Sequence, residues 1–121
     1  MNRLDALLDA LNALDGIEFV RDAWINDAPD TYGVLELTGE NGALWADDVM
    51  FEQAYGLRIT IYVKDDSDEW CERIQNVLEA FDLYYRLNQR NYDYGSDAVM
   101  WQWTATMYGP LTVPDKGEDD G

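Results

Sequence analysis

Acidic side chains are the most numerous groups in this sequence that could do chemistry, since Asp and Glu account for 25 of its 121 residues. Carboxylates in a loop before a helix can bind calcium, and the run Asp65–Glu69 stands before a helical pattern. A calcium loop that starts at Asp65 needs Gly at its sixth position and Glu at its twelfth, where this chain has Trp70 and Asn76. We therefore interpret the run as the cap of a helix.

A second acidic group consists of Glu40, Asp47, Asp48 and Glu52. These residues could gather a divalent cation only if their loop folds back on itself, so we interpret them as a solvated acidic loop. No spacing singles out one carboxylate pair for acid and base catalysis. The sequence therefore predicts neither a metal site nor a catalytic pair.

Nucleophilic centres are equally scarce. The sequence has no histidine, which removes the usual general base and any His-dependent triad. Ser67 and Ser96 lie outside a GxSxG context, and the single cysteine, Cys71, lies beside an apolar helical stripe, as a core or boundary residue does. There is no glycine-rich phosphate loop. We expect a protein of a reducing compartment that is not an enzyme and needs no cofactor.

Charge and length limit the remaining classes of function. Eight basic residues against 25 acidic ones give a net charge of -17, which disfavours specific nucleic-acid binding. The hydrophobic share of 47% is enough for one packed domain, predicted to span residues 1–109 before a mobile acidic tail at 110–121. Acids interrupt the leucine pattern at the N-terminus, so we expect a cytoplasmic protein with no signal peptide and no membrane contact.

The spacing of apolar residues predicts two helices. Leucines between Leu4 and Leu14 share one face, and Gly16 is placed to end the first helix. The second pattern starts at Trp70, and its helix is expected to reach about Leu87.

Residues that favour strands predict four of them, at Ile17–Ile25, Tyr32–Thr38, Tyr55–Lys64 and Val99–Tyr108. The last two alternate apolar and polar residues, so each buries one face. The turn residues Gly39–Gly42 are expected to end the second strand. The order α-β-β-β-α-β predicts an α+β two-layer sandwich, in which two helices cover one face of a mostly antiparallel sheet.

Aromatic and basic residues are interleaved in the stretch 84–94, a composition used both for stacking on bases and for protein interfaces. The net charge favours a protein partner over a nucleic acid. A structural role, in which the tyrosines cap the edge of the core, stays open. The candidate interface residues of this stretch are Tyr84, Tyr85, Arg86, Arg90, Tyr92 and Tyr94.

A second candidate interface lies at residues 43–51, which are mostly apolar although they follow a cluster of turn residues. Large apolar groups in a connection need somewhere to pack. The segment is expected either to form a hairpin arm or edge strand over the sheet, or to dock on a neighbouring subunit. Its candidate residues are Leu44, Trp45, Met50 and Phe51.

The order and lengths of these elements, over about residues 2–108, resemble the tail terminator (tail completion) proteins of long-tailed bacteriophages. Four features carry the resemblance: the leucine-striped first helix, the segment Ala28–Leu37 with its Pro-x-x-Tyr start, the long strand Tyr55–Lys64 followed at once by an acid-capped helix, and the closing strand Val99–Tyr108. The specificity lies in the order of elements and not in one motif.

The resemblance implies an assembly function without catalysis. Proteins of this family form a ring, typically a hexamer, that caps the head-proximal end of the tail tube and joins it to the head connector. The implied partners are further copies of the chain, the tail tube protein and the head-tail connector proteins, within the virion. An acidic lumen would keep DNA from adhering to the ring. Because subunits of charge -17 repel one another, their contacts must bury apolar area or involve cations.

Charge alone suggests an alternative, a small inhibitor whose carboxylates imitate phosphates and block a DNA-binding protein. Such a mimic needs a continuous stripe of acids. In this sequence, acids are spread over both predicted helices, several loops and the tail. A subunit elsewhere in the phage neck also stays open.

Overall fold

The computed structural model describes residues 2–24, 28–46, 49–64, 68–95 and 97–112, with the backbone alone at 40–46 and 49–53. In chain order, the elements are α1 (Arg3–Asn12), β1 (Glu18–Arg21), β2 (Tyr32–Ala46), β3 (Val49–Val63), α2 (Glu69–Ala80), β4 (Tyr84–Asp93) and β5 (Ala98–Tyr108). The strands form one sheet in the order β1-β2-β3-β5-β4. β1 and β2 are parallel, and all other neighbouring strands are antiparallel.

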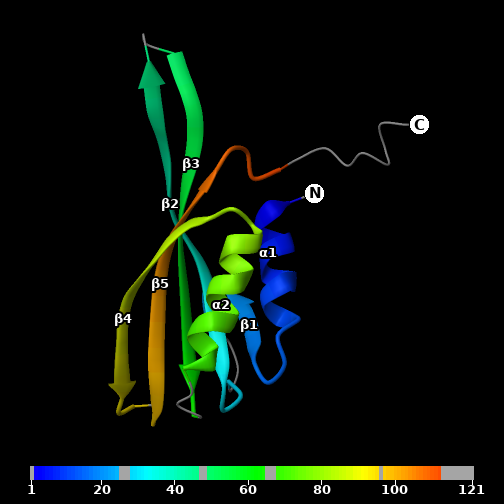
Figure 1. Ribbon diagram of the computed structural model, residues 1–121, viewed down its shortest axis with the longest axis vertical. Coiled ribbons are helices and arrows are strands. Elements are labelled where there is room, and N and C mark those ends of the chain that lie inside the picture. Colours follow the sequence, from blue (N-terminus) through cyan, green and yellow to red (C-terminus); the bar gives the residue numbers. More distant parts are fainter. Residues whose placement is uncertain (1, 25–27, 47–48, 65–67, 96, 113–121) are drawn as a thin grey trace, which may run out of the picture.

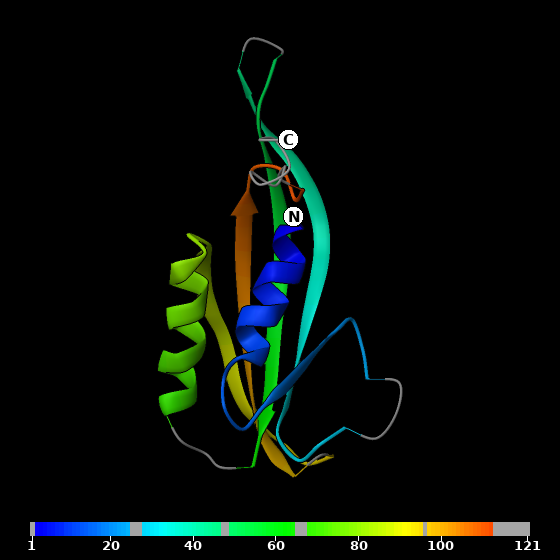
Figure 2. The ribbon, with the colours of Figure 1, turned by 90° about the vertical axis from the view of Figure 1, so that its right-hand side faces the viewer.

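Both helices lie on one face of this sheet (Figures 1 and 2). The predicted α+β sandwich with a mostly antiparallel sheet is therefore confirmed. The opposite face, which we call the open face, is covered by none of the helices of the described residues.

The core fills the space between the helices and the sheet. Alternation along β3 and β5 buries one face of each strand, as predicted, since Leu57 and Trp103 are fully buried while the residues on either side of each are only half-buried. The largest fully buried side chains are Trp103, Leu4, Leu7, Leu11, Leu35, Leu57, Ile59, Ile61, Ile74, Leu78, Met107 and Val63.

α1 begins at a side-chain cap. Asn2 Oδ1 accepts hydrogen bonds from the backbone N–H of Leu4 at 2.9 Å and of Asp5 at 3.1 Å. The helix ends two residues earlier than the leucine pattern suggests, and Gly16 follows with φ of 87°. The predicted helix and its glycine stop are otherwise in place.

α2 ends at Ala80 and not near Leu87, and the residues that follow form β4, which the predicted order lacks. The stop is a left-handed residue, Asp82, with φ of 56°. Leu83 N–H donates to Leu78 O, and Asp82 N–H donates to Glu79 O, the two hydrogen bonds of a Schellman motif. Sequence reasoning expected glycine in that role, and an aspartate performs it here.

Two further strand boundaries differ from the prediction. β1 stops at Arg21 because Asp22 takes φ of 70°. β2 does not stop at Gly39–Gly42 and continues to Ala46, with register shifts against β3 between Leu37 and Trp45. The turn residues therefore produce bulges in a long hairpin and do not end the strand.

Residues 110–112 return to the first turn of α1. Arg3 N–H donates to Leu111 O at 2.7 Å, and Arg3 Nη1 donates to Tyr108 O at 2.7 Å and to Pro110 O at 3.0 Å. Leu111 packs against the core. The structured chain thus extends past the predicted boundary at 109, while the rest of the predicted tail, residues 113–121, lies outside the described residues.

Candidate assembly surfaces

The β2–β3 hairpin projects past the other strands as an arm (Figure 1). β5 pairs with β3 only from Ala54 onward, and β1 pairs with β2 only up to Leu35. Beyond these points, the arm residues pair across the hairpin, with Leu44 opposite Glu52 and Trp45 opposite Met50. The backbone of residues 43–51 therefore forms a hairpin arm, but this arm projects beyond the sheet and does not fold back over it, and docking on a neighbouring subunit stays a prediction. The side chains of Leu44, Trp45, Met50 and Phe51 lie outside the described set.

The stretch 84–94 forms an edge strand, β4, and the turn after it. Only β5 pairs with β4, so the outer edge of β4 has no strand against it among the described residues. Tyr84 is 75% exposed, Tyr92 48% and Tyr94 88%. All six candidate residues of this stretch therefore lie along one edge of the sheet, on β4 and the turn after it.

A bulge divides β4 and separates its two arginines. The register shifts between Leu87 and Gln89. Arg86 lies opposite Thr104, whose side chain is on the open face, whereas Arg90 lies opposite the buried Trp101 on the helix face. Residues four apart in a regular strand share a face, so the bulge places a positive charge on each face of β4.

The helix face of β4 is held by specific contacts. The Arg90 guanidinium lies 5.1 Å from the centroid of the Trp101 ring. Tyr85 Oη donates a 2.6 Å hydrogen bond to Glu79 Oε1 of α2, and this bond raises the pKa of Tyr85. One of the candidate tyrosines thus has the structural role that the sequence left open.

The opposite edge of the sheet is closed. The side-chain amide of Asn12 in α1 bonds both backbone groups of Phe19 in β1, as acceptor from Phe19 N–H at 2.7 Å and as donor to Phe19 O at 3.1 Å. Arg21 O is also occupied, by Ala23 N–H at 2.8 Å. A side chain thereby replaces the strand that could otherwise pair with β1.

The open face is crossed by a chain of side-chain hydrogen bonds. Asn91 donates to Gln89 at 2.8 Å, Gln89 to Gln102 at 3.1 Å, and Gln102 to the Thr60 hydroxyl at 3.3 Å. These residues come from β4, β5 and β3, so the chain ties the edge strand to the centre of the sheet. Arg58 and Glu36 form an ion pair beside it at 3.2 Å.

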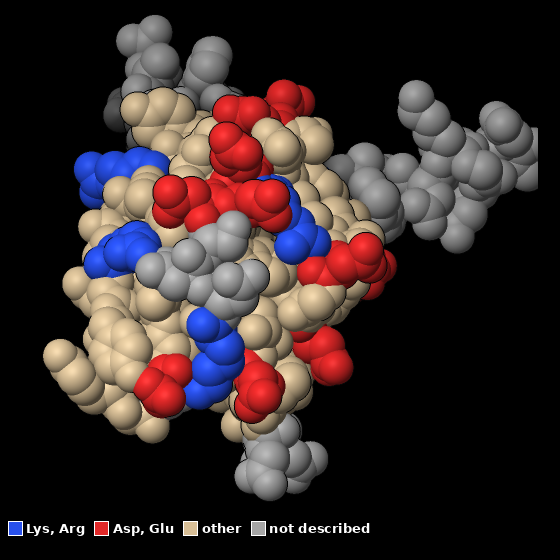
Figure 3. All heavy atoms as spheres, turned by 60° about the horizontal axis from the view of Figure 1, so that its bottom comes forward, with Lys and Arg blue, Asp and Glu red and all other residues tan. Residues whose placement is uncertain are grey.

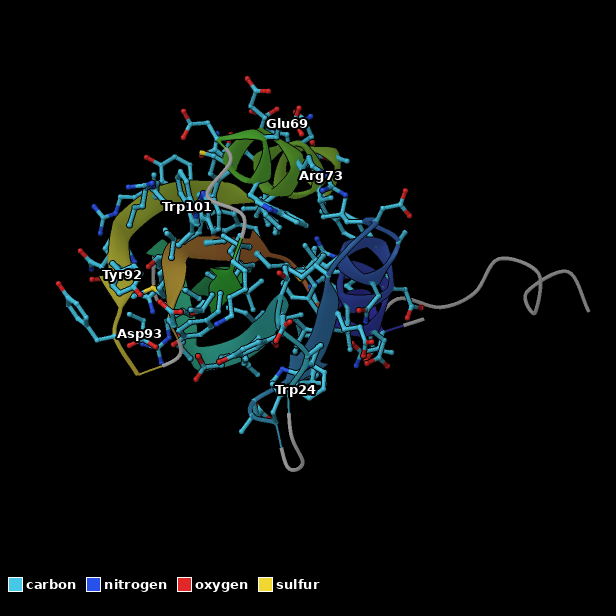
Figure 4. All side chains as sticks on the ribbon, turned by 90° about the horizontal axis from the view of Figure 1, so that it is seen from below. Trp24, Glu69, Arg73, Tyr92, Asp93 and Trp101 are labelled. Atoms are coloured by element: carbon cyan, nitrogen blue, oxygen red, sulfur yellow. The ribbon has the colours of Figure 1, made fainter. Side chains whose placement is uncertain are left out.

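An aromatic pocket of about 370 Å³ lies on the same face. Tyr32 and Tyr62 stack with their centroids 4.9 Å apart, and Trp24 meets Tyr32 edge-on at 5.9 Å. Burial is the main cause that raises the pKa of both tyrosines, and the Asp93 carboxylate adds to it. Figure 4 places Trp24 on the side of the sheet away from α2.

Cys71 and the acidic run before α2 were the candidates for a nucleophile and a calcium loop. Cys71 is partly buried against the core, its thiol donates to Gln75 Oε1 at 3.4 Å, and burial raises its pKa. This confirms the boundary position. Asp68 is the N-cap residue of α2, within the acidic run predicted to cap the helix, but its side chain accepts no capping hydrogen bond. Residues 65–67 lie outside the described set. Within the described chain, no cluster of His, Cys, Asp or Glu could hold a metal ion.

Sequence reasoning missed the Asn12–Phe19 closure and the Trp24–Tyr32–Tyr62 cluster. The alternation of β3 already placed Tyr62 on the polar face, but its stacking partner depends on the register between β2 and β3. Asn12 stood on the polar side of the first helix, with no local signal for its contact with β1.

Compared with known proteins, the chain matches no family model and no curated protein. Among the described helices, none has the length and apolar character needed to cross a membrane.

Proposed function

We propose that this chain is a structural subunit that assembles with copies of itself into a closed ring, through contacts made by the β2–β3 arm. The arm carries the proposal because residues 49–53, the part of β3 before Ala54, have no strand partner except β2 among the described residues. A lone two-stranded ribbon is at best marginally stable in water. Residues 43–51 are mostly apolar, so the ribbon gains stability when another chain covers it.

Within this class, we propose the role of a tail terminator. Such a ring would cap the head-proximal end of a phage tail tube and join it to the head connector. Support comes from the resemblance of the sequence to that family and from the α+β sandwich with two helices on one face of the sheet, although β4 is a strand beyond the predicted element order. The net charge of -17 also suits a ring through which DNA passes without adhering.

The distribution of charge supports assembly over phosphate mimicry. On the face seen in Figure 3, red acidic atoms lie in separate groups, divided by blue and tan atoms. A mimic of a nucleic-acid backbone needs acids in one continuous stripe. The described acids are instead spread over the outward sides of both helices and over strands and turns. Examples on the helices are Asp5, Asp9, Glu69, Glu72 and Glu79, and examples elsewhere are Glu18, Glu36, Asp82 and Asp93.

The test has two parts. Sedimentation velocity and electron microscopy of the purified chain should show closed rings. Tail tube protein from the same source, polymerised with increasing amounts of this chain, should give shorter tubes with a ring at one end. A chain that stays monomeric and leaves tube length unchanged would contradict the proposal. A monomer that forms a salt-sensitive complex with a basic DNA-binding protein would instead favour the inhibitor.

A further inference from the structure

Two parts of this chain have open strand edges in the described structure, and they carry opposite charge. β4 has an unpaired outer edge. In the arm, the outer edge of β2 is unpaired after Leu35, and the outer edge of β3 is unpaired before Ala54. Residues 84–92 contain two arginines and no acid, whereas residues 40–53 contain four acids and no basic residue. In a chain of net charge -17, β4 therefore carries a net positive charge, with two arginines and one acid, Asp93, at its last position.

On β4, the arginine available for a partner is Arg86. Other cations already contact their own chain: Arg3 binds the carbonyls of residues 108 and 110, Arg58 pairs with Glu36, and Arg73 donates to Asp15 O at 2.7 Å. Arg86 is exposed, and within the described residues its guanidinium has no carboxylate partner. Figure 3 shows blue atoms on the left-hand flank, the side on which β4 lies in Figure 1.

The other ways to pair a strand with β4 are unfavourable. The β1 edge of a second copy is occupied by Asn12. An antiparallel β4–β4 pair would join two strands that each carry two arginines and no acid within residues 84–92, so it would bring like charges together. A strand that carries acids and large apolar residues fits the β4 edge better, and the arm has both.

The geometry points to a head-to-tail contact in which the arm of one subunit adds along the outer edge of β4 of the next copy. This inference rests on the proposed self-assembly and names the two surfaces that meet. The arm supplies acids and apolar residues, and β4 supplies its open backbone, exposed tyrosines and a positive charge on each face. Each copy has one arm and one β4, so the contact repeats from subunit to subunit and can close a ring.

Charge reversal on each side tests the contact. Arg86→Glu alters β4, and the double change Glu40→Lys with Glu52→Lys alters the arm. We expect each variant alone to need at least about tenfold higher concentration to assemble, because like charges then meet at every contact. An equimolar mixture of the two variants should assemble again. When the variants alternate around the ring, every contact between an arm and a β4 edge joins opposite charges. Lys116→Glu, which makes the same charge change as Arg86→Glu and lies outside residues 40–53 and 84–93 in the sequence, should assemble as the wild type does.

Sedimentation velocity measures assembly, and circular dichroism verifies that each variant is folded. Recovery in the mixture would establish that arm and β4 are complementary surfaces. Rings that form equally well from each variant alone would overturn the contact while leaving self-assembly intact. Loss of assembly in both variants without recovery in the mixture would also overturn it. A wild type that forms no assembly at any concentration would contradict the proposed function itself.

Discussion

The side-chain amide of Asn12 takes both outward hydrogen bonds of Phe19, so a helix residue closes one edge of the sheet. The other edge, β4, has no such cover among the described residues. This asymmetry limits where another chain can add a strand. The β4 edge is therefore where we expect another chain to add a strand.

Replacing Asn12 should destabilise the fold. In Asn12→Ala, the Phe19 N–H and C=O lose their partners, which should lower the free energy of unfolding by about 1–3 kcal/mol. Urea denaturation followed by circular dichroism measures the change. The matched control is Asn76→Ala, at an exposed position of α2, which should change stability by less than about 0.5 kcal/mol. Equal effects of the two substitutions would refute the closing role of Asn12.

Gly33 should not tolerate a side chain. A Cβ at this position of β2 would overlap ring carbons of Phe19, which is 4% exposed and cannot move outward. We expect Gly33→Ala to cost about 1–3 kcal/mol of unfolding free energy. Gly39→Ala, in the same strand, should cost little because its Cβ would have nothing within 4 Å. Combining Gly33→Ala with Phe19→Ala should be less destabilising than the sum of both changes, and strict additivity would argue against the overlap.

High pH should weaken the fold through the stacked tyrosines. Burial raises the pKa of Tyr32 and Tyr62 above the ordinary 10.0, so the folded state favours their neutral phenols. Their contribution is fully present below the ordinary pKa and is lost as pH rises through the raised values. The variant Tyr32→Phe with Tyr62→Phe keeps the stacked rings and should lose less stability above pH about 10 than the wild type. Denaturation at a series of pH values tests this, with exposed Tyr84→Phe as the control. A parallel loss in wild type and variant would contradict the prediction.

Patterns with one buried face could be predicted from the sequence. The leucine stripe of α1 and the alternation of β3 and β5 mark the faces that form the core. β4 gave no such pattern because both its faces are largely exposed and a bulge interrupts its period. The end of α2 was missed because an aspartate, Asp82, adopts the left-handed conformation usually taken by glycine.

The candidate interface residues could be found by composition, but their arrangement could not. Aromatic and basic residues marked the stretch 84–94, and the structure turns it into an edge strand. Apolar residues marked the stretch 43–51, and the structure places its backbone in a projecting hairpin (Figure 1). The closure at Asn12 depends on contact between α1 and β1, which local sequence does not specify.

Native mass of the wild type and of a variant without the arm tests the central claim most directly. Asn41 and Ala54 are cross-strand partners, so residues 42–53 can be replaced by Asn-Gly, a two-residue turn suited to antiparallel strands. We predict closed rings for the wild type across a concentration series, and a folded monomer with similar thermal stability for the shortened variant. Rings of the same mass from both proteins would contradict the claim that the arm makes the assembly contact.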